Sequence, residues 1–228
     1  ARADAALMPT YGRQPVAFVR GEGVHLFDRD GHAYIDCVGG ISMINVGHAH
    51  PAVAAAIADQ AARLINTSNL FYTEPQVALA EWIRDSSIGG KVFFCNSGAE
   101  ANEAALKLAR QYWVETGRPD KHKIIALFPA YHGNTLLALS ASAREHYKTY
   151  YREWLVDIHR IPAPYVYRCE CGGVLDPRTG SINDCPVCTG SALERAIGEI
   201  GAGNVAAFIA EPVGGSSTGH SVPRPDYF

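Results

Sequence analysis

The sequence has no apolar run long enough to cross a membrane and no large excess of charge of either sign. A membrane-spanning helix needs about 20 consecutive apolar residues, whereas Ala52–Ala58, among the longest apolar runs, has about seven. The net charge of −3 gives no indication of a nucleic-acid or membrane partner. Because the N-terminus lacks a basic segment followed by an apolar stretch, no secretory signal is predicted and a cytoplasmic location is expected.

The composition is instead that of a globular protein with a core. Apolar residues make up 47% of the 228 residues and charged residues 19%, which excludes a largely disordered chain. At roughly 100–200 residues per domain, this length predicts one large domain, or one domain and part of another. No internal repeat or low-complexity segment divides the chain further.

Short strands and two helices are expected in the first part of the chain. Val24–Phe27 and Ala33–Asp36 flank an Asp-Gly pair, which is a strong signal for a β-hairpin. Helices are expected over Pro51–Leu64 and Pro75–Asp85, where proline stands in the first turn and apolar residues recur at helical spacing. His48 and His50 lie beside Pro51 and are interpreted as loop residues rather than metal ligands.

From residue 92 the pattern changes to alternating strands and helices. Strands are expected at Val92–Cys95, Lys123–Leu127, Asp157–Ile161 and Val205–Ala210, and the main helices at Gly98–Thr116 and Ser191–Ile200. Continuous apolar strands that alternate with helices are typical of an α/β fold, here a mostly parallel sheet with helices on both faces.

The segment Asn96–Ala101 joins an expected strand to an expected helix. Ligands bind at the carboxyl ends of parallel strands, and a helix N-terminus there offers free N–H groups that suit a phosphate. Gly98 lets the backbone approach closely, and Ser97 can add a hydroxyl. The alternative is that Ser97 only caps the helix, with Glu100 completing a capping box.

Two more strand ends carry residues suited to chemistry. Tyr131 and His132 follow the Lys123–Leu127 strand, where an aromatic ring can stack on a flat ligand and a histidine can act as an acid or base. Glu211 ends the Val205–Ala210 strand and points a carboxylate toward the same edge. The alternatives are an ordinary loop with a partly buried tyrosine, and a surface ion pair for Glu211.

Taken together, these residues resemble the class III pyridoxal-phosphate aminotransferases, which have fold type I. The matching stretches run in family order from about residue 15 to the C-terminus: Leu26–Asp28, Asp30-Gly31, Tyr34–Asp36, Gly39–Ile41, Val46–Pro51, Tyr72–Pro75, Asn96–Glu103, Ala130–Gly133 and Ala210–Pro212. Each motif alone is weak, whereas all of them in order make a chance match very improbable.

The resemblance implies a binding site for pyridoxal 5′-phosphate, which acts as the electron sink while the protein orients it. The implied cofactor-binding residues are Ser97, Gly98, Ala99, Tyr131, His132 and Glu211, and the implied substrate-channel residues are Gly40, Ile41 and Tyr72. In that arrangement the N–H groups of Gly98 and Ala99 bind the phosphate, and Tyr131 stacks on the pyridine ring.

The resemblance also implies a reaction and an organisation. An amino group would pass from an amine, alanine or ω-amino acid donor to a 2-oxo acid such as pyruvate, in a homodimer. Residues 1–65 would belong to the small domain and an interface arm, and residues 66–228 to a partial large domain with an insert at 162–190. A lyase or racemase on the same scaffold remains an alternative, as does a non-catalytic zinc-ribbon binding module.

The family's catalytic lysine has no counterpart in this sequence. Members use a lysine that forms a Schiff base with the cofactor, and an aspartate that keeps the pyridine nitrogen protonated. Both belong to segments downstream of the strand that ends at Glu211. None of the five lysines matches that context: Lys91, Lys107, Lys121, Lys123 and Lys148. The chain therefore resembles an N-terminal half, no catalytic residue is assigned, and the chain alone is expected to be inactive.

Four cysteines in the insert have the spacing of a metal site. Cys169, Cys171, Cys185 and Cys188 form a C-x-C…C-x₂-C pattern with glycine after each pair, as in zinc ribbons. The prediction is a structural zinc ion, since four thiolates leave no open position. Two disulfides or reduced thiols are the alternatives, and the lack of a secretory signal argues against disulfides. Most of the family lacks this insert, although the alanine–glyoxylate-type branch has a cysteine-containing loop near here.

Two more cysteines lie outside the insert. Cys37 and Cys95 are expected to be buried core thiols.

Overall fold

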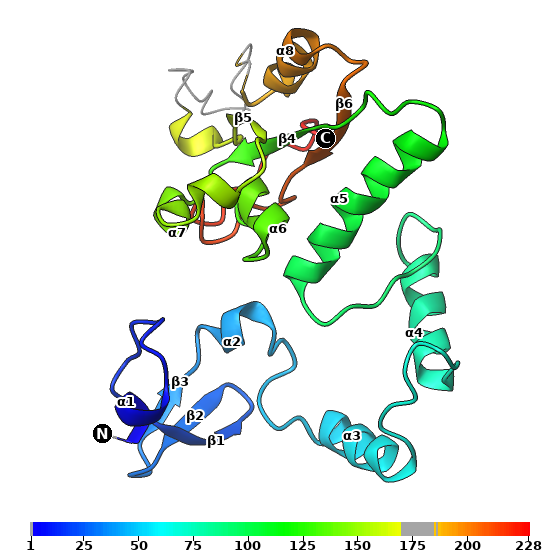
Figure 1. The fold of residues 1–228 in the computed structure, drawn as a ribbon. Helices are drawn as coiled ribbons and strands as arrows, with labels where there is room; N and C mark the ends of the chain where they lie inside the picture. Colours follow the sequence, from blue (N-terminus) through cyan, green and yellow to red (C-terminus); the bar gives the residue numbers. More distant parts are fainter. Residues whose placement is uncertain (1, 170–184, 186) are drawn as a thin grey trace. The chain divides into compact units, whose positions relative to one another are not determined.

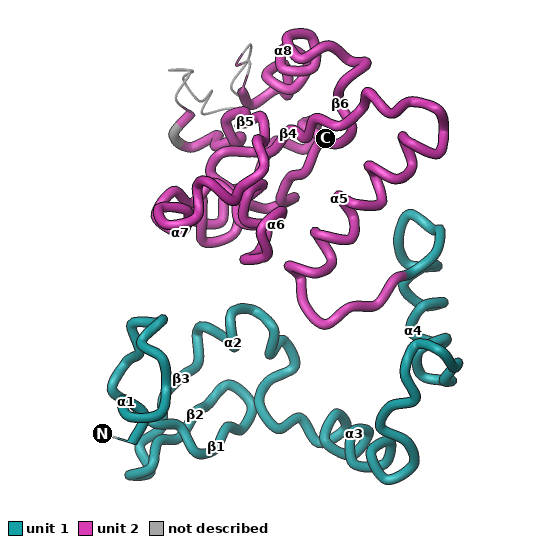
Figure 2. Tube along the Cα trace, viewed as in Figure 1, with its two compact units in different colours: residues 1–92 teal, residues 93–228 magenta. Residues whose placement is uncertain are grey.

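The computed structural model describes residues 2–169, 185 and 187–228. The chain forms two compact units, residues 1–92 and 93–228 (Figure 2), each described by itself. The sequence-based boundary at residue 65 concerns the domains of a whole enzyme and stays a prediction. Among the described helices, none is both long and apolar enough to span a membrane.

The first unit contains a small antiparallel sheet. After the short helix α1 (Arg2–Ala6), strands β1 (Phe18–Glu22), β2 (His25–Asp28) and β3 (Ala33–Ile35) pair in that order (Figure 1). The expected hairpin is confirmed, with Leu26 opposite Tyr34. The Asp28 carboxylate fixes the turn by accepting the N–H of His32 at 2.9 Å and the hydroxyl of Tyr34 at 2.9 Å.

Three helices complete the first unit: α2 (Gly39–Ser42), α3 (Pro51–Arg63) and α4 (Glu74–Asp85). The two longer helices confirm the sequence-based expectation, and a proline stands in the first turn of each. Their apolar side chains remain exposed in this chain, for example Ile57 at 64% and Trp82 at 68%. Periodicity therefore identified these helices correctly, although the described residues do not cover their apolar faces.

An aspartate–histidine pair joins the loop before α3 to the end of the small sheet. The Nε2 of His48 lies 2.7 Å from Asp36, whose other carboxylate oxygen accepts the N–H groups of Val38 and Gly39 at 2.9 Å. The hydrogen bond from His48 is the largest influence that lowers the pKa of Asp36. His48 is thus a loop-anchoring residue, as expected from the sequence.

The second unit is built on a parallel sheet with the strand order β5-β4-β6. Its strands are β4 (Lys123–Phe128), β5 (His159–Pro162) and β6 (Val205–Ile209), and its helices are α5 (Gly98–Glu115), α6 (Leu136–Ala141), α7 (Glu145–Lys148) and α8 (Ser191–Ile200), with 3₁₀ turns η1 (Arg152–Trp154) and η2 (Val166–Arg168). In register, Ile125 pairs with His159 on one side and Phe208 on the other.

Successive side chains of β4 are buried on opposite faces of this sheet. Ile125 and Leu127 pack with Ala192 and Ala196 of α8, whereas Ala126 packs in a second cluster. That second cluster contains Leu106 of α5, Ala141 of α6 and Ile158. Figure 1 shows α8 and α5 on opposite sides of the strands. The expected parallel sheet with helices on both faces is confirmed.

Two sequence-based expectations are wrong. Val92–Cys95 forms no strand, and Phe93 is 71% exposed. An extended segment needs a neighbouring strand to pair its backbone groups, and within the described residues no strand pairs with this one. Cys37 and Cys95 are exposed rather than buried, because the described residues do not cover the segments that carry them.

Candidate functional site

The N-terminus of α5 is capped by the side chain that the sequence indicated. The Oγ of Ser97 accepts the N–H of Glu100 at 3.2 Å. The Glu100 carboxylate reaches back and accepts the N–H of Asn96 at 2.6 Å. The reciprocal bond thus closes on Asn96, one residue before the cap, rather than on Ser97 as in an ordinary capping box.

Capping leaves the first N–H groups of α5 available to a ligand. A helix has no internal acceptors for its first N–H groups, and those of Gly98 and Ala99 have no hydrogen-bond partner among the described residues. A Cβ added to Gly98 would meet no atom within 4 Å, so the space beside it is open. An 18-residue helix also places partial positive charge at this end. The turn is therefore suited to a phosphate.

The first turns of α5 are tied to the loop that follows β4. Asn102 donates from Nδ2 to the carbonyl oxygen of His132 at 2.7 Å, and Thr135 donates its hydroxyl to Glu103 at 2.6 Å. Gly133, with φ 131°, lies against the helix, and a Cβ there would lie 2.5 Å from the Cβ of Ala99. Glycine is therefore required where the two segments meet. Asn102 and Glu103 lie inside a recognised motif, but nothing in their spacing revealed this positioning role.

His132 is buried at the bottom of this loop. It is 5% exposed, and its backbone N–H is donated to Ser142 Oγ at 2.8 Å. Its Nε2 is buried and has no hydrogen-bond partner among the described residues. Burial lowers the pKa of His132, opposed by the weaker effect of the Glu211 charge. The imidazole is therefore favoured in its neutral form.

Glu211 links the carboxyl ends of β4 and β6. Its carboxylate accepts the backbone N–H of Tyr131 at 3.2 Å, the N–H of Gly215 at 3.2 Å and the hydroxyl of Ser217 at 3.2 Å. These donors occupy Glu211 in place of the surface ion pair that was the alternative. The Tyr131 ring remains 41% exposed and lies 6.4 Å, centroid to centroid, from the Tyr147 ring. Its aromatic surface is thus partly open.

The candidate cofactor residues therefore form one group within the second unit: Ser97, Gly98, Ala99, Tyr131, His132 and Glu211. Their individual roles stay predictions. The candidate substrate residues Gly40, Ile41 and Tyr72 belong to the first unit. Ile41 is 87% and Tyr72 95% exposed, and Gly40 and Ile41 have φ of 62° and 64°.

The two most buried lysines are held by backbone carbonyl groups. Lys148 donates to Ser140 at 3.1 Å, and Lys121 donates to Ala202 at 2.6 Å and to Val205 at 3.0 Å. Burial and then the Arg160 charge lower the pKa of Lys148 to about 8. Among the described residues, neither lysine is hydrogen-bonded to the group around Tyr131.

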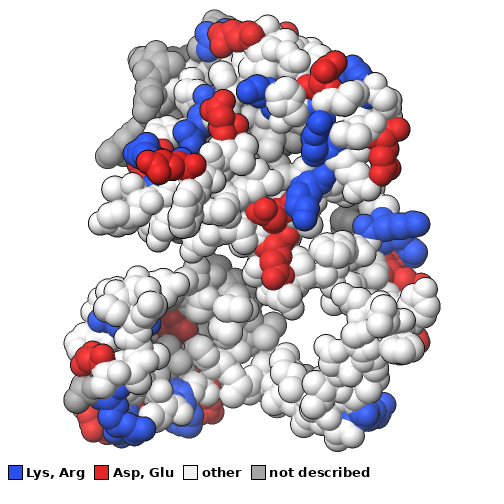
Figure 3. Space-filling model, viewed as in Figure 1, with Lys and Arg blue, Asp and Glu red and all other residues white. Residues whose placement is uncertain are grey.

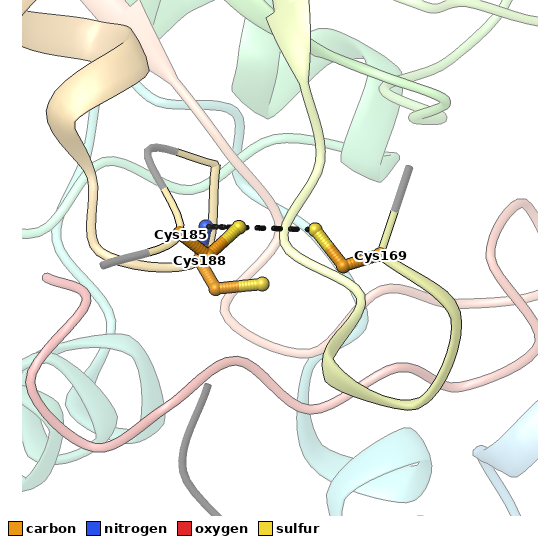
Figure 4. Close-up of side chains that lie close together, drawn as sticks. All are labelled: Cys169, Cys185 and Cys188. Carbon is orange, nitrogen blue, oxygen red and sulfur yellow. Dashed lines mark hydrogen bonds between the residues drawn. The ribbon is translucent and has the colours of Figure 1, made fainter. Parts of the chain in front are cut away.

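Three of the four insert cysteines come together next to α8. Cys169, Cys185 and Cys188 have their sulfur atoms within 4.8 Å of one another (Figure 4). Cys171, the fourth predicted ligand, lies outside the described residues. Burial is the largest effect on the Cys188 thiol and raises its pKa.

A cavity of about 300 Å³ lies between the cysteines and the end of the sheet. Phe128 and Pro129 line it from the end of β4, Cys169 and Val187 from the cysteine segments, and Ser217 from the segment after β6. Ser217 also donates to Glu211. The cavity is therefore bordered both by a cysteine of the cluster and by a partner of the Glu211 carboxylate.

Comparison with known proteins gives consistent matches. A family model described as aminotransferase class-III matches residues 7–228. The acetylornithine aminotransferase of Methanosarcina acetivorans is 40% identical over 221 residues, or 97% of this chain and 47% of that protein. That of Caldanaerobacter subterraneus is 46% identical over 156 residues, or 68% of this chain and 40% of that protein. The chain thus spans less than half the length of these curated relatives.

Solved structures give the same result. A thermostable (S)-enantioselective omega-transaminase from Thermomicrobium roseum superimposes with a TM-score of 0.85 at 31% identity, over 99% of this chain and 51% of that one. The omega transaminase from Pseudomonas jessenii in complex with PMP gives a TM-score of 0.87 at 26% identity, over 99% and 51%. These likenesses confirm the expected fold class.

Proposed function

This chain belongs to the class III aminotransferase family, and from that premise we propose that it forms the N-terminal half of a pyridoxal-phosphate-dependent transaminase. The proposal rests mainly on one observation. A phosphate-suited helix N-terminus, a partly open aromatic ring and a carboxylate are joined by hydrogen bonds and close packing in the second unit. The catalytic lysine and the aspartate for the ring nitrogen would come from the part of the relatives that this sequence does not span.

The site fits pyridoxal phosphate at both ends of that molecule. The N–H groups of Gly98 and Ala99 would hold the phosphate, since they have no partner among the described residues. Tyr131 would lie on the ring, and the buried Nε2 of His132 is a third polar atom with no partner among the described residues. When bound, the cofactor supplies an electron sink that stabilises negative charge on the substrate carbon.

In this proposal Glu211 and Asn102 are positioning residues. Glu211 holds the backbone of Tyr131 through the N–H at 3.2 Å, and Asn102 holds the carbonyl of His132 at 2.7 Å. Both bonds fix the loop relative to the N-terminus of α5. Fixing these two parts matters because the phosphate and the ring of one rigid molecule must be bound at the same time.

We propose an ω-amino acid, amine or alanine as donor and a 2-oxo acid such as pyruvate as acceptor. The curated relatives named acetylornithine aminotransferase favour a donor of the ω-amino acid type, and the structures titled omega-transaminase are consistent with it. Gly40, Ile41 and Tyr72 would contribute to the substrate channel. A homodimer and a cytoplasmic location are further parts of this proposal.

The binding-module alternative finds no added support. On the face drawn in Figure 3, Lys and Arg are interspersed with Asp and Glu within each unit. No extended surface of positive charge gathers on that face, whereas nucleic-acid binding needs one. The cysteine cluster takes no part in the proposed transamination, and a zinc ion held there would be structural.

The test uses this sequence joined to a downstream half of the kind that the relatives have. With pyridoxal phosphate, the purified protein should show the cofactor's visible absorption band, which borohydride should remove. It should also transfer an amino group from N-acetylornithine or another ω-amino donor to a 2-oxo acid. Absence of both the band and the transfer would refute the proposal.

Two substitutions test the ring contact. Tyr131→Ala should weaken cofactor binding by about two- to tenfold, since stacking of an aromatic ring contributes about 0.5–1.5 kcal/mol. Tyr131→Phe should bind nearly as well as the wild type because it keeps the ring. Tyr150→Ala is the control, since Tyr150 is 88% exposed and outside the site. Equal weakening by all three variants would mean that Tyr131 has no specific contact with the cofactor.

A further inference from the structure

The cysteine cluster is the strongest unassigned feature outside the candidate cofactor site. Cys169 follows η2, whereas Cys185 and Cys188 come just before α8, so the cluster joins two separate segments (Figure 4). Cys188 is fully buried and Cys185 is 3% exposed. We propose that these three thiolates bind a zinc ion that fixes the start of α8 and one wall of the adjacent cavity.

The sulfur positions suit tetrahedral coordination. With a Zn–S distance of about 2.3 Å, the sulfur atoms of a tetrahedral site lie about 3.8 Å apart. Here the Sγ atoms of Cys169 and Cys185 are 3.1 Å apart, and all three lie within 4.8 Å of one another. The required spacing falls inside this range, so small side-chain rotations bring the thiolates into place. The 3.1 Å separation is also well beyond the roughly 2.05 Å of a disulfide bond.

One backbone N–H beside the cluster favours a thiolate at Cys185. The N–H of Cys188 is directed at the Sγ of Cys185, with a distance of 3.4 Å. An N–H donated to a sulfur stabilises its negative charge, and the two-residue spacing of this pair is that of a zinc knuckle. Arg224 also interacts electrostatically with Cys188. Three thiolates and Zn²⁺ carry a net charge of −1, which a nearby guanidinium partly offsets.

Residues next to the cysteines connect the proposed metal site to helix α8. Val166 and Val187 pack against the buried cysteines. Thr189 donates its hydroxyl to the Cys185 carbonyl at 2.7 Å, and Gly190, with φ 80°, leads directly into α8. That helix buries Ala192 and Ala196 against the sheet. Because so few apolar side chains hold these segments, a metal ion would supply much of their stability.

One of these ligands, Cys169, borders the cavity beside the candidate cofactor site. Cys169 and Val187 line it together with Ser217, which donates to Glu211. Metal binding would therefore keep this wall in place without touching the reacting groups.

The first experiment measures metal in the intact protein, purified without chelators. Elemental analysis should find one zinc ion per chain, and Co²⁺ substituted for it should give the absorption bands of a tetrahedral thiolate site. These readouts need neither pyridoxal phosphate nor activity, so they are independent of the proposed transamination. No zinc after purification and after incubation with Zn²⁺, or a disulfide among these cysteines in the unreduced protein, would overturn the proposal.

Cysteine variants then locate the ion. Cys185→Ser and Cys188→Ser should each lose most of the zinc, whereas Cys37→Ser and Cys95→Ser should keep it, because those cysteines are exposed and outside the cluster. Retention of zinc by both cluster variants at the control level would place the metal elsewhere and refute the assignment. If a cluster variant does not fold, the Co²⁺ spectrum of the wild-type protein still decides whether thiolates bind the metal.

Discussion

Gly133 is the position at which a single added methyl group should separate two parts of the candidate site. A Cβ at this residue would lie 2.5 Å from the Cβ of Ala99 and 2.7 Å from its Cα. Carbon atoms that touch without overlap lie about 3.5–4.0 Å apart, so Gly133→Ala creates an overlap on the order of 1 Å. The Ala99 backbone belongs to the phosphate-suited end of α5, which cannot move without losing its hydrogen bonds to the loop.

The expected cost combines overpacking and backbone strain. Forcing extra atoms into a packed region costs about 1–3 kcal/mol, and the φ of 131° is one that L-residues rarely adopt, which adds about 1 kcal/mol or more. Gly133→Ala should therefore lower the free energy of unfolding of residues 93–228 by about 2–4 kcal/mol. It should also weaken pyridoxal-phosphate binding, because the phosphate and ring contacts are displaced relative to each other.

Urea unfolding followed by circular dichroism, and cofactor titration, measure the two effects. Gly198→Ala is the matched control, since a Cβ there meets no atom within 4 Å and the residue lies inside α8. It should be neutral or stabilising by up to about 1 kcal/mol. Adding Ala99→Gly to Gly133→Ala should restore only part of the stability, because the overlap with the main chain of residue 99 remains. If Gly133→Ala has the same urea concentration at the midpoint of unfolding as the wild type, the reasoning is refuted.

Three further substitutions test other parts of the chain. Lys148→Met should raise the free energy of unfolding at pH 7 by about 1–3 kcal/mol, because it removes a buried charge; Lys107→Met, on the exposed face of α5, should not. Since the pKa of Lys148 is about 8 in the folded protein and ordinarily 10.5, wild-type stability should rise between these pH values, and a flat profile would contradict this. The pKa of Asp36 is lower in the folded protein than its ordinary value of 3.8. Ionised Asp36 therefore adds to the free energy of unfolding above pH 3.8, and this contribution is lost as the pH falls through the folded pKa. In acid unfolding experiments, Asp36→Asn should lack this loss of stability at low pH, whereas Asp59→Asn should keep it. Ile41→Gly should stabilise the protein by about 0.5–1 kcal/mol. The left-handed conformation of Ile41 costs a β-branched residue about 1–2 kcal/mol, and the greater backbone entropy of glycine in the unfolded chain cancels part of the gain. A lower melting temperature for this variant would exclude strain at Ile41.

Local signals in the sequence were sufficient for most helices and for the hairpin. Apolar spacing and caps located α3, α5 and α8 to within one or two residues, because helix hydrogen bonds join residues four apart. The strand predicted at residues 92–95 was wrong because strand formation depends on contacts that are not local in the sequence. A strand exists only when a second strand pairs with it, and its apolar residues alone could not show whether a partner lies beside it.

The order of short motifs along the chain identified the family from the sequence alone. Ser97, Gly98, Tyr131 and Glu211 were found because each follows a strand-like segment, and Ala99 was added by the resemblance to the family. Only the tertiary structure showed how these residues are held. Glu211 meets the Tyr131 backbone across 80 residues, Asn102 meets His132 across 30, and Gly133 packs on Ala99.

For the cysteines too, part of the outcome was predicted from the sequence and part was decided by the tertiary structure. Their spacing predicted that the insert cysteines meet at one zinc ion, and Cys169 does lie close to Cys185 and Cys188. The exposure of Cys37 and Cys95, which were expected to be buried, depended on packing. Sequence determines local conformation through bonds between near neighbours. Burial and contacts between distant segments follow from the way the β5-β4-β6 sheet and its helices pack, which no local pattern records.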